Sequence, residues 1–171
     1  MDLQEAILEE HSKAQCDRIV RYVGKDKKKF AALMKLFFTG EYRVVQRAAW
    51  PVSVCVEKHP LLIGPYFKKI LDYMQEPGTH EAVWRNSVRL LQFVDIPKRY
   101  HGRVMSSCFE FISDPQTPIA VKADSLTVLD NLAGIYPEIK PELKLIIEER
   151  WPHETAAFRS RGKKILKKLG S

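Results

Sequence analysis

The chain has 171 residues, of which 45% are hydrophobic and 29% are charged, and its net charge at pH 7 is +7. This composition supplies enough apolar residues for a packed core, which excludes a disordered chain and favours a single domain over residues 1–171. The acid-rich start MDLQEAILEE lacks the basic and apolar regions of a signal peptide, and no apolar run is long enough to span a bilayer. We therefore expect a cytoplasmic protein that does not enter a membrane.

Helical periodicity runs through almost the whole chain, and prolines and glycines interrupt it at regular intervals. It predicts one N-terminal helix near 3–22. Four helix pairs are predicted to follow, near 26–38 and 41–58, 64–75 and 79–95, 99–113 and 117–134, and 138–150 and 154–169.

The helix pairs also repeat in sequence. One basic residue recurs in the second helix of each pair at spacings of 38, 37 and 37 residues: Arg47, Arg85, Lys122 and Arg159. In the first helices an apolar column recurs at a spacing of 37: Met34, Leu71, Cys108 and Leu145. Repetition at a period of 20–50 residues is typical of stacked-repeat proteins, so we predict that the apolar column is buried in one continuous core.

The segment Glu41-Tyr-Arg-Val-Val-Gln-Arg47-Ala-Ala resembles the second helix of a HEAT repeat, in which an acid precedes an arginine by six positions. The resemblance implies an all-α, right-handed α-solenoid (an α-α superhelix) of about four helix pairs, with residues 1–25 as an N-terminal cap. The implied repeats are about 26–60, 61–97, 98–137 and 138–171. It also implies that the second helices line a concave face.

No catalytic or cofactor-binding motif appears in the sequence. It contains no phosphate-binding loop, no dinucleotide-binding glycine pattern and no H-E-x-x-H zinc motif. The five histidines are scattered, mostly at predicted helix ends, and Cys16, Cys55 and Cys108 have no metal-ligand spacing. We therefore predict reduced thiols, no catalytic residue, no cofactor and no metal site.

Two clusters of basic residues account for the positive charge. Residues 159–171 hold six lysines and arginines and no acid, and residues 17–35 hold seven against two aspartates. Such clusters attract nucleic acid or acidic proteins, although a solvated helix face is the simpler explanation.

Candidate binding residues come from the basic column and from two nearby tryptophans. They are Arg43, Arg47, Trp50, Trp84, Arg85, Arg89, Lys122, Arg159 and Arg161. On a concave face these arginines and lysines would bind an anionic partner; alternatively, they hold neighbouring repeats together, and the tryptophans are core. We expect Arg47 to be bound to Glu41, the acid six positions before it, and Arg89 to be free.

The preferred interpretation is a non-enzymatic scaffold, expected to be a monomer, that presents a partly basic concave surface to a protein partner. The alternative is a nucleic-acid-binding protein that uses the same surface. Within that alternative, the chain would be similar to the HEAT-like alkylpurine DNA glycosylases, with Asp124 as the one carboxylate that could stabilise a cationic transition state.

Overall fold

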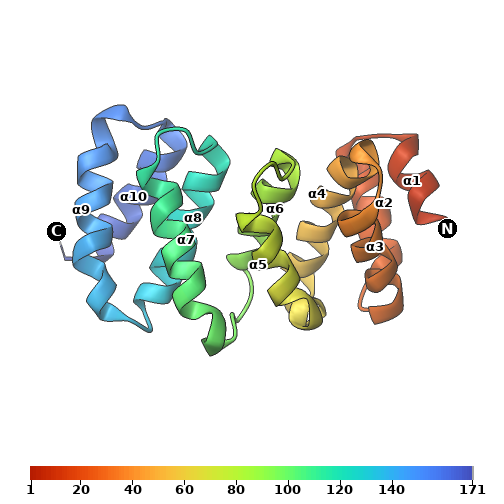
Figure 1. Ribbon diagram of the computed structural model, residues 1–171, viewed down its shortest axis with the longest axis horizontal. Coiled ribbons are helices and arrows are strands. Elements are labelled where there is room, and N and C mark those ends of the chain that lie inside the picture. Colours follow the sequence, from red (N-terminus) through yellow and green to blue (C-terminus); the bar gives the residue numbers. More distant parts are fainter. Residues whose placement is uncertain (171) are drawn as a thin grey trace. The chain divides into compact units, whose positions relative to one another are not determined.

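A computed structural model describes residues 1–170, which form ten α-helices joined by turns and short 3-10 helices, with no β-strand among them (Figure 1). The predicted all-α class is confirmed. Backbone contacts divide the chain into two compact units, Met1–Asp95 and Ile96–Ser171, and each is described by itself.

Unit 1 consists of two short helices followed by two helix pairs. Its helices are α1 (Leu3–Glu9), α2 (Lys13–Val23), α3 (Lys27–Thr39), α4 (Tyr42–Lys58), α5 (Phe67–Gln75) and α6 (Glu81–Leu91). A 3-10 helix, η1 (Pro60–Tyr66), connects α4 to α5. Within this unit α4 packs against α3 and α6, and α1 and α2 also contact α4 (Figure 1).

The N-terminal cap differs from the prediction of one helix over 3–22. The chain leaves the helical conformation at Glu10, and α2 begins after Ser12, whose side-chain oxygen accepts a hydrogen bond from the Gln15 N–H at 3.1 Å. Ser12 is therefore the N-cap of a second helix, since a capping oxygen satisfies one of the free amides of the first turn.

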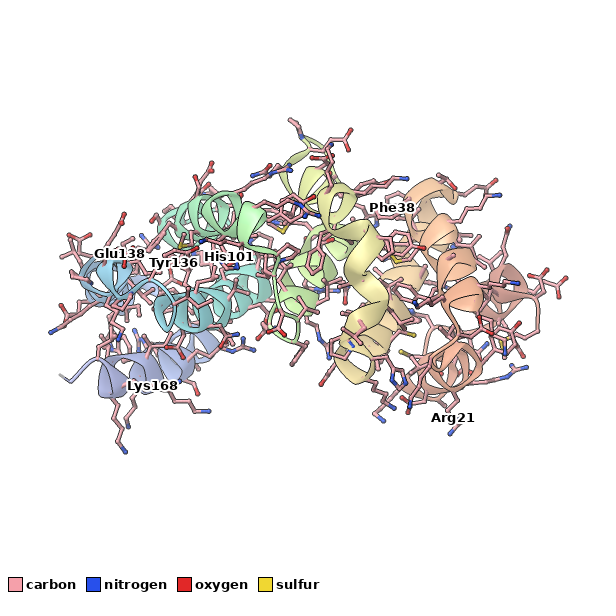
Figure 2. The ribbon with its side chains drawn as sticks, turned by 90° about the horizontal axis from the view of Figure 1, so that it is seen from below. Arg21, Phe38, His101, Tyr136, Glu138 and Lys168 are labelled. Atoms are coloured by element: carbon pink, nitrogen blue, oxygen red, sulfur yellow. The ribbon has the colours of Figure 1, made fainter. Side chains whose placement is uncertain are left out.

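Unit 2 contains two helix pairs, α7 (His101–Ser113) with α8 (Ile119–Ala133), and α9 (Lys140–Arg150) with α10 (Ala156–Lys168). Three-residue 3-10 helices precede α7 and α9 and follow α9: η2 (Lys98–Tyr100), η3 (Pro137–Ile139) and η4 (Trp151–His153). The helix α8 packs against α7 and α10. The buried His101 ring lies beside Tyr136, whose hydroxyl is 2.8 Å from Nδ1, and this contact ties the start of α7 to the turn after α8 (Figure 2).

The apolar column predicted for the first helices is buried at three of its four positions. Met34, Leu71 and Cys108 are at most 1% exposed, whereas Leu145 is 54% exposed. In α9 the core positions are instead Leu143 and Ile147. They lie 39 residues after Val104 and Cys108, so the repeat is two residues longer here, and a shift of two residues turns a helical side chain about 200°. The prediction for Leu145 was wrong.

The core of unit 2 includes one position where only glycine fits closely. A Cβ at Gly162 of α10 would lie 3.0 Å from Ile147 Cγ2 and 3.2 Å from Trp151 Cζ3. The absence of a side chain therefore allows α10 to approach α9 and the turn that follows it.

All three thiols are unpaired and buried. Burial raises the pKa of Cys16 to about 11 and those of Cys55 and Cys108 to about 12. At neutral pH the thiols are protonated, and the thiolate that reacts with electrophiles is scarce.

Candidate functional site

The candidate binding residues fall into both units: Arg43, Arg47, Trp50, Trp84, Arg85 and Arg89 in unit 1, and Lys122, Arg159 and Arg161 in unit 2. Most of their cationic groups have a partner within their own unit. These internal partners determine which of the cationic side chains are available to a ligand.

Arg47 joins α4 to the N-terminal cap. Its Nη1 donates to the carbonyl oxygen of Leu8 at 2.8 Å, and it makes no hydrogen bond to Glu41, contrary to expectation. The two side chains leave α4 in different directions because six helical positions correspond to about 240° around the axis. The Trp50 ring meets the His11 ring edge to face, 6.0 Å between centroids, so Trp50 also packs against the cap.

Arg89 joins α6 to α4, and the expectation that it is free was wrong. Its Nη2 lies 3.6 Å from Glu57 Oε2, in a pair that is more than one-third exposed on each side. Exposed pairs of this kind contribute about 0–1 kcal/mol. A buried hydrogen bond of 3.0 Å between Ser53 Oγ and Asn86 Oδ1 connects the same two helices.

Arg161 makes a corresponding connection between α10 and α8. Its Nη1 lies 2.8 Å from Asp124 Oδ1 and 3.0 Å from both the Ala123 carbonyl oxygen and Thr127 Oγ1. Asp124 is buried. The nearby guanidinium neutralises its charge, so this carboxylate is not available to stabilise a cation on a substrate.

Lys122 is buried in an ion pair of unit 2. Its Nζ lies 2.9 Å from Glu154 Oε1, and Arg150 Nη2 reaches the same oxygen at 2.9 Å. Burial by itself would raise the pKa of Glu154, but the hydrogen bonds from Lys122 and Arg150 outweigh it and hold the pKa below the ordinary value. This cluster connects α8 and α9 to the turn before α10.

Arg159, the last member of the basic column, lies on the surface of α10 but bonds to backbone. Its Nε donates to the Trp151 carbonyl oxygen at 3.0 Å, and its Nη2 donates to that of Pro152 at 3.4 Å. It thus satisfies carbonyl groups of η4, at the start of the turn between α9 and α10.

Two of the candidate arginines remain on the surface of unit 1 without a partner among the described residues. Arg43 on α4 and Arg85 on α6 are exposed, and neither makes an ion pair or hydrogen bond with any residue that the structure describes. Trp84, next to Arg85, is half-buried. Because α4 and α6 pack against each other, both guanidiniums belong to one pair of neighbouring helices.

A second basic surface lies on α10. The lysines at 163, 164 and 167 are exposed and make no ion pair with residues 1–170. Spacings of three and four residues put them on one side of the helix. Lys168, which is labelled in Figure 2, differs from these lysines because its Nζ lies 2.7 Å from Asp130 Oδ2 on α8.

Unit 1 also contains a pocket that the sequence did not indicate. It has a volume of about 290 Å³ and lies between the starts of α4 and α6 and the end of α5. Its walls include Tyr42, Val45, Tyr73, Glu76, His80 and Val83. The one unusual signal in the sequence is Tyr42, a large aromatic at the first position of a helix, and in the structure it is 72% exposed.

Within residues 1–170, no three histidine, cysteine, aspartate or glutamate side chains are arranged so that they could hold a metal ion. None of the described helices is both long and apolar enough to cross a bilayer.

Helix pairs that pack against a neighbouring pair, as they do within each unit, are typical of a stacked helical-repeat protein. The model of the HEAT repeat domain family matches residues 3–169. The chain therefore belongs to the HEAT repeat family and is a helical-repeat scaffold. No curated protein and no solved structure matched it.

Proposed function

We propose that the chain is a non-enzymatic scaffold that binds an acidic segment of a protein partner through exposed residues of α4 and α6. The observation that carries the proposal is the pair Arg43 and Arg85, two exposed guanidiniums on neighbouring helices without partners among the described residues. Arginine binds carboxylates through planar, two-pronged hydrogen bonds, which suits an acidic peptide. Trp84, half-buried beside Arg85, adds aromatic surface of the kind that anchors protein partners.

The other predicted binding residues are left out of the proposed contact surface. Arg47, Arg89, Lys122, Arg159 and Arg161 are each engaged within the protein, and Trp50 packs against the cap. Releasing them would cost internal contacts before any new contact formed. The proposal includes a single domain acting as a monomer in the cytoplasm, as the sequence led us to expect.

The test is affinity capture from nuclease-treated extract of the source cells, with identification of the captured proteins by mass spectrometry. We compare the wild type with an Arg43→Glu/Arg85→Glu variant. The matched control is Lys27→Glu/Lys28→Glu, which makes the same charge change at exposed positions of the same unit. Proteins retained by the wild type and the control but lost from the arginine variant support the proposal. Equal retention by all three contradicts it.

The lysine face of α10 favours nucleic acid as a second candidate ligand. Three exposed lysines on one helix side suit a phosphate backbone, whose binding weakens with salt by about 0.9 logarithmic units per phosphate contacted on duplex DNA. Fluorescence anisotropy with a labelled DNA duplex, measured across salt concentrations, tests this. A Lys163→Glu/Lys164→Glu variant should bind more weakly and with a smaller salt slope; unchanged binding would exclude this surface.

A further inference from the structure

Neither Arg43 nor Arg85 lines the pocket of unit 1, although Arg43 directly follows the wall residue Tyr42. The pocket volume of about 290 Å³ is near the lower end of the ~300–1,000 Å³ range of small-molecule sites, so the pocket suits one side chain better than a whole ligand. All of its walls come from α4, α5, α6 and the loop between α5 and α6, within a single unit.

Aromatic rings form much of the wall, and backbone contacts hold two of them in place. The Tyr73 hydroxyl donates to the carbonyl oxygen of Phe38, a residue at the end of α3. Figure 2 labels Phe38. The His80 ring is fixed because its Nδ1 accepts the Ala82 N–H at 2.9 Å and caps α6. The Tyr42 ring lies against His80 with 4.3 Å between centroids. Rings that are already positioned need little reordering when a ligand binds.

The Nδ1 of His80 is already engaged, because it accepts the Ala82 N–H at the start of α6. An Nδ1 that accepts a hydrogen bond has no proton of its own, so the hydrogen lies on Nε2. Protein atoms cover this Nε2, so it offers no donor to an anionic ligand in the pocket.

The charge at the pocket is negative, in contrast to the basic surfaces. Glu76 is in its wall, and no lysine or arginine is among the described residues that line it. The Glu76 carboxylate makes no ion pair with residues 1–170, and its charge, together with burial, raises the pKa of Tyr73. Glu41 and Glu81 are exposed and adjacent in sequence to Tyr42 and His80. Two cations also lie near these walls: Arg43 follows Tyr42, and the Nζ of Lys69 lies over the Phe38 ring beside Tyr73.

From these observations we infer that the pocket binds a cationic side chain, an arginine or lysine, of a protein partner. A cation over tyrosine faces is attracted by the negative face of each ring, an effect of about 0.5–1 kcal/mol at exposed sites. The Glu76 carboxylate adds a charge-assisted hydrogen bond. An apolar side chain would desolvate Glu76 without compensation, and an anion would be repelled.

The probe is N-acetyl-arginine N-methylamide, titrated into ¹⁵N-labelled full-length protein and followed by NMR chemical shifts. N-acetyl-citrulline N-methylamide is the matched control, since it replaces the guanidinium with a neutral urea of similar shape. We expect the arginine compound to shift amides around Tyr42 and in residues 76–83, and the citrulline compound to bind several-fold more weakly. Equal binding of the two, or shifts confined to other surfaces, overturns the inference.

Single substitutions distinguish the contribution of the Tyr42 ring from that of the Glu76 carboxylate. Tyr42→Ala and Glu76→Gln should each weaken binding of the arginine compound about two- to fivefold, in line with 0.5–1 kcal/mol. Tyr42→Phe should retain it because the ring face remains, and Arg43→Ala should not weaken it. Loss of binding in Tyr42→Phe, or no loss in Tyr42→Ala, contradicts the cation–π arrangement. These outcomes are independent of the Arg43/Arg85 capture experiment.

Discussion

The Nζ of Lys122 lies 2.9 Å from Oε1 of Glu154, with only 7% and 3% of the two side chains exposed. A basic residue in a repeated column, which sequence reasoning placed on a binding surface, is therefore an internal link of unit 2. Because Arg150 bonds to the same carboxylate oxygen, two cations share one buried acid. Removal of the single negative charge should therefore cost more stability than removal of one of the two positive charges.

We expect Glu154→Gln to destabilise the protein by about 3–5 kcal/mol, because the buried Lys122 and the partly buried Arg150 would lose their counter-charge. Lys122→Met keeps the apolar stem, and Arg150 still neutralises Glu154, so its cost should be about 2 kcal/mol. Urea denaturation measures both. The exposed pair Lys144–Glu148 supplies the control, since Lys144→Met should change stability by less than about 0.5 kcal/mol. Equal losses in the two buried variants would contradict this arrangement.

The Lys122–Glu154 ion pair also predicts that the stability of the protein depends on pH. The pKa of Glu154 in the folded protein is lower than its ordinary value of 4.5, so ionised Glu154 stabilises the folded state above that value. This contribution is lost as the pH falls below 4.5 toward the folded pKa. The difference in unfolding free energy between wild type and Glu154→Gln should therefore shrink between about pH 6 and about pH 3. A difference that stays constant over this range would show that Glu154 is not the titrating group.

Leu71 and Leu145 occupy the same position in the sequence repeat but differ in burial, which makes a matched pair of variants. Leu71→Ala should cost about 2–5 kcal/mol because it deletes a fully buried side chain. Leu145→Ala should change stability by less than about 0.5 kcal/mol. Thermal or urea unfolding of the two variants measures the contrast. Similar losses of stability in both variants would mean that Leu145 faces the core, as the 37-residue period predicts.

Gly162→Ala should destabilise the protein by about 0.5–2 kcal/mol. Overpacking against Ile147 and Trp151 costs about 1–3 kcal/mol, which exceeds the gain of up to about 1 kcal/mol from replacing glycine in a helix. Gly102 of α7 is the control: a Cβ there meets nothing within 4 Å, so Gly102→Ala should be neutral or stabilising. Differential scanning calorimetry compares them, and stabilisation by Gly162→Ala would show that α10 moves away from α9 at little cost.

The sequence was sufficient to predict the helix pairs, because an apolar stripe and the prolines and glycines between helices are local signals. The break before α2 was also readable, since Ser12 followed three residues later by Gln15 is a capping pattern. The rotation of α9 was missed because the 37-residue period was extended to a repeat in which the core positions are 39 residues apart.

The partners of the basic residues could not be read in the same way. Arg47 bonds to a carbonyl 39 residues away, and Arg161 pairs with an acid 37 residues away. Sequence neighbours carry no information about such contacts. The Tyr42 pocket was missed for a related reason, since its walls come from three helices and a loop.

The burial of Cys16, Cys55 and Cys108 has a practical consequence for spectroscopy. With thiol pKa values of about 11 and about 12, the native cysteines should react slowly with maleimides at neutral pH. One cysteine introduced at an exposed site outside the proposed contact surface, such as position 27, can therefore carry a fluorophore or spin label without removal of the native three. The wild-type core is thus preserved in any labelled derivative used to follow partner binding.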